Sequence, residues 1–145
     1  MRSRGPLRSY TVHIGSSFMR FEPPDTCLVA YVGDLSGDDV TPMNAAIEEV
    51  AKSIDGMFML VDLSRTGEVT GHAREGGLHG MRALNPRGTA VFGADFRLRV
   101  VATLITKAAA LIDARVKGPV SFHEREDQAR AWLEGVRRHP GHSHL

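Results

Sequence analysis

The feature that most constrains the fold of this chain is a nearly all-apolar run at residues 57–63, MFMLVDL, which gives way to the polar sequence SRTGEVT. A short run without polar alternation is typical of a parallel strand that is covered on both faces. Ligands and partners of open α/β sheets usually dock outside the carboxyl ends of such strands. The polar stretch after the run is therefore the first place to look for a functional site.

Strand and helix patterns alternate along the rest of the chain. Residues 10–22 predict two short strands joined by a turn at Gly15-Ser16-Ser17, and residues 26–33 predict a stronger strand. The later predicted elements are a helix capped by Thr41 with Pro42 at its first position, the apolar strand, a short irregular helix at 73–84, a strand at 89–93, a helix capped by Asp95, a strand at 120–123 and a helix containing Trp132. This order predicts an α/β domain with a mostly parallel sheet, an antiparallel N-terminal edge and about four helices.

Two of the predicted helices have unusual compositions. The helix at 73–84 contains Gly76, Gly77 and Gly80, and each glycine costs about 1 kcal/mol relative to alanine. We therefore expect this helix to be irregular. The helix capped by Asp95 has a broad apolar stripe that we expect to be buried. Its members are Phe96, Val100, Val101, Leu104, Ala108, Leu111 and Ile112.

The size and composition predict one domain at residues 10–138, between a flexible basic arm at 1–9 and a flexible His-containing tail at 139–145. The chain has 145 residues, 42% of them hydrophobic, and a net charge of +1. So small a net charge produces only a weak electrostatic attraction to nucleic acid, which we therefore do not expect as a partner. The single cysteine, Cys27, is expected in the core. The chain shows no signal peptide and no apolar run of about 18 residues, so we expect it to be cytoplasmic and not transmembrane.

Several segments occur in an order that resembles a known family. They are VAYVGDLSGDDVTP, VDLS, TAVFG and the closing SFHEREDQARAWL. Over about residues 12–138 they resemble the SpoIIAA-like group of STAS and SEC14-like proteins. The resemblance implies a non-enzymatic regulatory module of bacterial signalling without a cofactor, like the anti-sigma factor antagonists that bind a kinase-like anti-sigma partner. The related SEC14-type domains imply an alternative, a small ligand or lipid held between the sheet and the glycine-containing helix.

The resemblance also implies a regulatory site after the apolar strand. In those antagonists an Asp-Leu-Ser strand end is followed by an Asp-Ser-Ser-Gly segment at a helix N-terminus, and phosphorylation there ends partner binding. Here Asp62-Leu63-Ser64 matches the first element, whereas Val69-Thr70-Gly71-His72 replaces the second. The predicted partner or regulatory residues are Asp62, Ser64, Thr66, Thr70, Gly71 and His72. Thr70 and Ser64 are candidates for phosphorylation, although a helix cap and a strand end are the more usual roles of such residues.

A second set of residues forms a possible ligand rim. Asp34, Asp62 and Asp95 each follow a predicted strand, so they are expected at one edge of the sheet, as ligands for Mg²⁺ or basic groups or as turn formers and caps. The turn from Gly93 to Phe96 is a candidate anion site. No metal site is predicted, because His72 and His79 have no acidic partner at ligand spacing. No nucleophile or acid–base pair predicts an enzyme.

Basic residues cluster on and after the helix capped by Asp95. An acidic partner or a lipid headgroup fits this strip, and a solvated helix face is the simpler interpretation. The residues are Arg97, Arg99, Lys107, Arg115 and Lys117.

Overall fold

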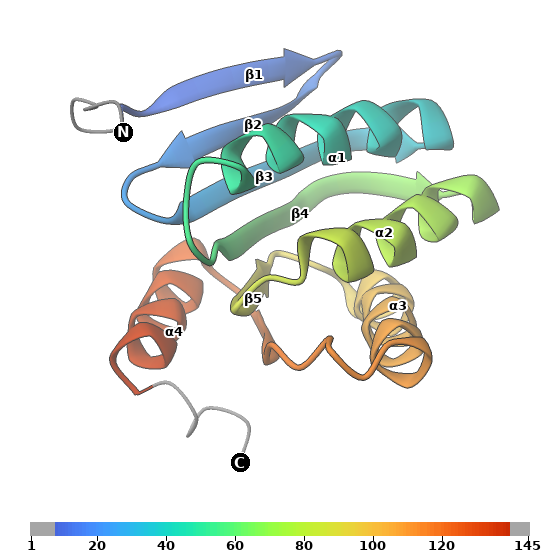
Figure 1. The fold of residues 1–145 in the computed structure, drawn as a ribbon. Coiled ribbons are helices and arrows are strands. Elements are labelled where there is room, and N and C mark those ends of the chain that lie inside the picture. Colours follow the sequence, from blue (N-terminus) through green and yellow to red (C-terminus); the bar gives the residue numbers. More distant parts are fainter. Residues whose placement is uncertain (1–7, 140–145) are drawn as a thin grey trace.

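Six strands form one mixed sheet whose spatial order follows the chain, β1-β2-β3-β4-β5-β6, in the computed structural model, which describes residues 8–139 (Figure 1). The strands are β1 Tyr10–Ile14, β2 Ser17–Glu22, β3 Thr26–Leu35, β4 Phe58–Val69, β5 Gly88–Phe92 and β6 Val120–His123. The helices are α1 Gly37–Ala51, α2 Gly71–Leu84, α3 Phe96–Ile112 and α4 Glu126–Arg138. The predicted arm and tail lie largely outside the described residues, since 1–7 and 140–145 belong to them.

The strand directions confirm the predicted sheet. β1, β2 and β3 are antiparallel neighbours, and β3 to β6 run parallel with one helix between each pair. Because the strand order never reverses, the three crossover helices α1, α2 and α3 lie side by side on one face (Figure 1). This sheet therefore has no switch point, the place where α/β sheets usually form a ligand crevice.

The apolar run at the start of β4 is buried on both faces, as its composition predicts. Phe58 and Leu60 pack with the α4 side of the sheet, whereas Met59 packs with the α1 side. β3 and β5 flank this part of β4 from Phe58 to Asp62. Neighbours on both edges and both faces explain why the segment needs no polar side chain before Asp62.

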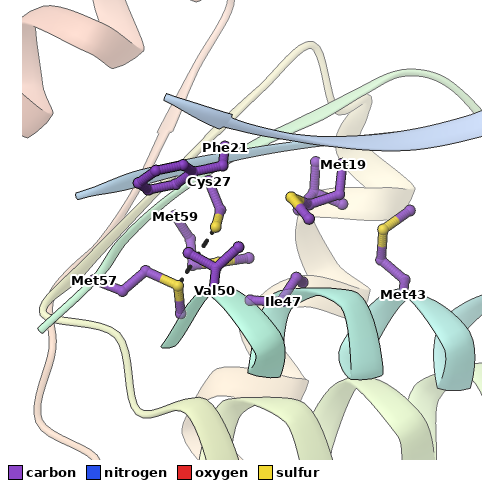
Figure 2. Packing of buried hydrophobic residues seen from close by; sticks show 9 residues of the cluster. Met19, Phe21, Cys27, Met43, Ile47, Val50, Met57 and Met59 are labelled. Atoms are coloured by element: carbon purple, nitrogen blue, oxygen red, sulfur yellow. Dashed lines mark hydrogen bonds between the residues drawn. The ribbon is translucent and has the colours of Figure 1, made fainter. Parts of the chain in front are cut away.

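The space between α1 and the first strands is filled by large flexible side chains. Met19, Met43 and Met57 belong to one buried cluster with Cys27, whose Sγ lies 3.5 Å from Met57 Sδ (Figure 2). Burial, with a smaller contribution from the charge of Glu22, raises the pKa of the Cys27 thiol to about 12. Cys27 is therefore a core residue, as predicted.

Ion pairs hold α4 on the opposite face. Arg130 donates to both carboxylate oxygens of Glu22, at 2.8 and 3.0 Å, and Arg137 donates to Asp25 at 2.8 Å. The hydrogen bonds from Arg130 lower the pKa of Glu22. The closing segment that carries the family resemblance thus has a structural role, because its Arg130 binds the last helix to β2, and Arg137 beyond it binds the helix to the following turn.

The start of α1 differs from the prediction. Ser36, not Thr41, is the N-cap, and its side chain accepts from Asp38 N while Asp39 accepts from Ser36 N at 2.7 Å. This reciprocal pair is a capping box, which satisfies two backbone donors at once. Pro42 consequently lies inside the helix and not at its first position.

The helix α2 is longer and more regular than its glycines suggest. It begins at Gly71 and continues unbroken to Leu84. A Cβ atom at Gly76 would lie 2.8 Å from Val40 Cγ1, and one at Gly80 would lie 2.7 Å from Asn44 Oδ1. The glycines therefore let α2 approach α1 closely, and this packing offsets their low helix propensity.

The apolar stripe of α3 is largely exposed, contrary to the prediction. Phe96 is 82% exposed and Leu111 is 88% exposed, and the fully buried positions of the helix are Leu98 and Ala109. Asp95 caps the helix as expected, accepting from Leu98 N at 2.8 Å. The helix was thus predicted correctly, but most of the expected stripe is exposed, and the buried side carries Leu98 and Ala109.

Candidate functional site

The predicted polar loop after the apolar strand is a continuation of β4. The strand extends to Val69 because the end of β3 pairs with it, as far as the pair Leu35 and Val69, with register shifts along the way. β5 separates from β4 after Asp62. The segment after Asp62, which was predicted to be a partner-binding loop, is therefore the end of β4 and pairs with the end of β3. We call this pair of strand ends the extension.

Two predicted regulatory residues form a local turn at the point where β5 departs. Asp62 Oδ1 accepts from Ser64 N at 2.9 Å and from Ser64 Oγ at 2.6 Å. Gly93 has a φ of +77°, and a Cβ atom there would lie 2.6 Å from Ser64 Cβ. Glycine is required at 93 because the chain that follows β5 passes directly against Ser64 with a positive φ.

The extension fixes two other candidates. Asp34 Oδ1 accepts from Glu68 N at 2.8 Å, and Thr66 Oγ1 donates to the carbonyl oxygen of Tyr31 at 2.8 Å. Since Asp34 lies level with Glu68, six residues beyond Asp62, about 20 Å of strand separates the two aspartates. They do not converge on one ligand.

Thr70, Gly71 and His72 form the exposed start of α2. Thr70 Oγ1 accepts from Ala73 N at 3.2 Å and is the N-cap of the helix. His72 Nδ1 lies 3.4 Å from Glu75 Oε1, and both side chains are exposed. A Cβ atom at Gly37 would lie 3.2 Å from His72 Cβ, so the first turns of α1 and α2 adjoin.

The turn from Gly93 to Phe96 is not built to bind an anion. Gly93 N donates to the carbonyl oxygen of His123 at 3.1 Å. The Asp95 carboxylate occupies the N-terminus of α3, where it repels anions. Asp34, Asp62 and Asp95 thus each accept a hydrogen bond from a backbone amide. Among residues 8–139, no group of three His, Cys, Asp or Glu side chains is arranged to hold a metal ion.

A cavity of about 170 Å³ lies between the sheet and the helices α2 and α3. Its walls come from β3, β4, β5 and the facing sides of α1, α2 and α3. The lining residues include Tyr31, Asn44, Thr66, Gly77, Met81, Val101, Ala102, Ile105 and Thr106. Of the predicted site residues, only Thr66 lines this cavity.

The polar groups in the cavity wall are mostly engaged with the protein itself. Asn44 Nδ2 donates to Gly76 O at 3.0 Å, and Thr106 Oγ1 donates to Thr103 O at 3.0 Å. Burial, with a smaller effect of Asp39, raises the pKa of the Tyr31 phenol, so Tyr31 is neutral at physiological pH. The cavity therefore offers a largely apolar and uncharged surface.

The lining residues are ordinary apolar residues in sequence, so no motif identifies them. The available signal is the run Gly76, Gly77 and Gly80, which marks a helix with little side-chain volume. The cavity lies at the place predicted for the alternative ligand, between the sheet and the glycine-containing helix, and ligand binding there stays a prediction. Of the α3 residues that line the cavity, Val101 belongs to the stripe that was expected to be buried, whereas Ala102, Ile105 and Thr106 were missed.

Comparison with known proteins identifies the fold. No protein-family model and no curated protein matches the chain. The anti-sigma factor antagonist SpoIIAA, solved in its unphosphorylated form, matches with a TM-score of 0.60 at 14% identity, over 83% of this chain and 100% of SpoIIAA. An uncharacterised DUF3478 protein from Shewanella loihica PV-4, described as having a SpoIIAA-like fold, matches with a TM-score of 0.55 at 18% identity, over 92% of this chain and 98% of its own. The chain therefore has the STAS or SpoIIAA-like fold expected from its sequence.

In the part of the chain that the structure describes, no helix has both the length and the apolar character needed to cross a bilayer.

Proposed function

We propose that this chain is a non-enzymatic binding module that holds a small apolar ligand, or the apolar chain of a lipid, between the sheet and the helices α2 and α3. The cavity of about 170 Å³ is the observation that carries this proposal. An apolar cavity of about 150 Å³ in another protein stays dry and binds benzene. The space here is thus large enough for a ring or a short alkyl chain.

The chemistry of the wall favours a ligand without charge on its buried part. Asn44 and Thr106 each donate a hydrogen bond to a backbone carbonyl, and the described lining residues include no charged side chain that could pair with a charged group. A buried charge without a partner is strongly unfavourable. The ligand's polar end, where it has one, belongs outside the cavity.

The test fills the cavity with a side chain and compares it with the same change elsewhere on α3. Ala102 lines the cavity, whereas Ala110 is exposed on the same helix. We expect n-octanol or toluene, at about 100 times its Kd, to raise the melting temperature of the wild type by roughly 5 to 10 °C. Ala102→Leu should abolish this shift and Ala110→Leu should retain it.

Native mass spectrometry gives a second readout of the same proposal. Protein purified from its own cells is expected to carry a small apolar ligand that Ala102→Leu excludes. The proposal fails when the wild type carries no extra mass and neither probe raises its melting temperature. A shift that survives Ala102→Leu unchanged also contradicts it, because the probe then binds elsewhere.

A second candidate function is the capture of a protein partner, an anti-sigma or kinase-like regulator, through the end of β4 and the start of α2. Its support is the exposed hydroxyl of Thr70 at a helix N-cap, together with the fold shared with SpoIIAA. A phosphate at a helix N-terminus is stabilised by free amides and the helix dipole. Thr70 is thus chemically suited to a charge switch.

Thr70→Asp tests this candidate without removing the cap, because aspartate is also a good N-cap residue. We expect quantitative affinity capture from the native cells to recover less partner with Thr70→Asp than with the wild type. Thr70→Ser keeps both the cap and the neutral hydroxyl, so it should capture partner normally. Equal capture by all three proteins would remove Thr70 as the switch.

A further inference from the structure

The outer side of α3 is an unusual surface, because large apolar side chains protrude from it. In the described part of the chain, five of the six exposed large apolar side chains belong to this helix. Their exposed fractions are 82% for Phe96, 41% for Val100, 62% for Leu104, 88% for Leu111 and 57% for Ile112. Single exposed apolar residues need no explanation, but a contiguous apolar surface marks an interaction site.

The spacing of these residues makes them one stripe. Phe96, Val100, Leu104 and Leu111 follow one another at intervals of four, four and seven residues, so they lie within about 80° of the helix circumference. The stripe runs along most of a 17-residue helix, about 25 Å in length. We call these four residues the outer stripe.

The other side of α3 is apolar as well. Leu98 packs against the sheet, and Val101, Ala102 and Ile105 line the cavity. Packing on the protein's own core therefore accounts for one side of the helix and leaves the outer stripe unexplained. A helix that is apolar on both sides is normally surrounded by apolar material.

The charge around the outer stripe is positive. Residues 96–117 contain five basic residues and one acidic residue, Asp113, a net charge of +4, whereas the whole chain carries only +1. Lys107 is exposed and lies at the angular position of the stripe itself. Arg97, Lys117 and Arg115 are exposed nearby, although Asp113 pairs with Arg115 at 2.7 Å and Glu68 lies 3.8 Å from Arg97.

Apolar side chains flanked by lysine and arginine are typical of helices that lie in the plane of an anionic membrane surface. α3 is the last helix of the layer, next to α2, and its outer stripe is exposed (Figure 1). A second copy of the chain would instead place two such positive faces against each other, which Coulomb repulsion disfavours.

We propose that the outer stripe docks on the surface of an anionic phospholipid bilayer. Phe96, Leu104 and Leu111 enter the region between headgroups and acyl chains, and Lys107 extends its ammonium group to the phosphates. This docking does not require the cavity to be occupied, so it goes beyond the proposed ligand binding. Docking would place α3, which also lines the cavity, against a bilayer that contains apolar molecules.

Vesicle sedimentation of the full chain tests the proposal. We expect the wild type to pellet with vesicles of 70% phosphatidylcholine and 30% phosphatidylglycerol in 50 mM salt, and much less with phosphatidylcholine alone. The double variant Leu104→Gln, Leu111→Gln should lose at least about tenfold in partitioning, because each buried leucine contributes a large apolar transfer free energy. Lys107→Gln should lose a smaller factor and only on anionic vesicles.

Controls separate docking from folding and from cavity binding. Tyr10 is 45% exposed on β1, so Tyr10→Gln removes an exposed apolar side chain far from α3 in sequence and should leave pelleting unchanged. The double variant should keep the wild-type melting temperature and the response to n-octanol, whereas Ala102→Leu should keep vesicle binding. The proposal is overturned when the wild type ignores anionic vesicles, or when the double variant pellets equally. A dimer in lipid-free solution that the double variant abolishes would also overturn it, in favour of self-association.

Discussion

Two neighbouring regions on the same face of the sheet differ in how completely they are filled. Beneath α1, large side chains such as Met19, Met43 and Met57 are buried in one cluster (Figure 2). Beneath α2 and α3, by contrast, a cavity of about 170 Å³ remains. A crossover helix covers the sheet in both regions, although the first region also includes the antiparallel strand β2, which carries Met19. The presence of a crossover helix therefore does not explain the difference.

The sizes of the side chains on the covering helices do explain it. α1 presents Met43, Ile47 and Val50 to the sheet, and methionine adapts its shape to fill gaps. Toward the cavity, α2 contributes Gly77 and α3 contributes Ala102. The small residues that α2 and α3 present here leave a space, whereas the larger residues of α1 fill theirs.

The largest effect is expected from the same truncation in the two regions. Met43 is fully buried on α1, whereas Met81 lies half-buried in the cavity wall on α2. Met43→Ala should lower the free energy of unfolding by about 2 to 5 kcal/mol. Met81→Ala should cost at most about 1.5 kcal/mol, because a side chain beside an empty space has fewer contacts to lose.

Urea denaturation with an unchanged m-value measures both truncations on one scale. The substitution and the secondary structure are the same in the two variants, so helix propensity contributes equally. A Met81→Ala cost equal to that of Met43→Ala would mean that the second region is as well packed as the first. That result would contradict the difference in packing between the two regions.

An intermediate effect is expected at the glycines of α2, which face different neighbours. In Gly80→Ala, the new methyl group meets Asn44 Oδ1 at 2.7 Å and disturbs the hydrogen bond from Asn44 Nδ2 to Gly76 O. The loss of this buried bond outweighs the gain in helix propensity, so we expect a net destabilisation of about 1 to 2 kcal/mol.

Gly77→Ala is the matched control on the same helix. Its methyl group would lie 3.2 Å from Ile105 Cδ1, the end of a flexible side chain beside the cavity. Ile105 has space to move, so the gain in helix propensity should leave the variant about 0.5 to 1 kcal/mol more stable. Two equal losses of stability would show that the contact between α2 and α3 is as tight as that between α1 and α2.

The fold was predictable because its main signals are local. The apolar start of β4, the strand and helix alternation and the Asp95 cap each depend on a few neighbouring residues, and the structure confirms them. The start of α1 was wrong because two capping sequences compete there, and the reciprocal Ser36 and Asp39 pair prevails over Thr41. Which of two suitable residues caps the helix depends on the conformation of the loop that precedes it.

The candidate site was less predictable because it depends on contacts between distant segments. The polar stretch after Asp62 becomes a strand only because the end of β3 reaches it, and the buried side of α3 is the one that carries Leu98 and Ala109. Periodicity shows that a helix has an apolar side but does not show which of two apolar sides is buried. That ambiguity explains why Ala102 and Ile105 of α3 were missed as cavity residues.

The smallest effect is expected when one methylene is added to each region, and here the two regions should respond with opposite signs. Val50 is buried in the filled cluster beneath α1, whereas Val101 lines the cavity. Val50→Leu crowds a packed core and should cost about 1 kcal/mol. Val101→Leu extends into empty space and should gain about 0.8 kcal/mol, the transfer free energy of one methylene group.

Both changes replace a β-branched helical residue by leucine, so their difference in the free energy of unfolding isolates the packing. Chemical denaturation resolves a gap of nearly 2 kcal/mol between the two variants. The measurement also connects stability to binding, because Val101→Leu should weaken the response to n-octanol while Val50→Leu should not. A loss of stability at Val101 with intact probe binding would show that the space is already occupied by protein side chains in solution, and that the probe binds elsewhere.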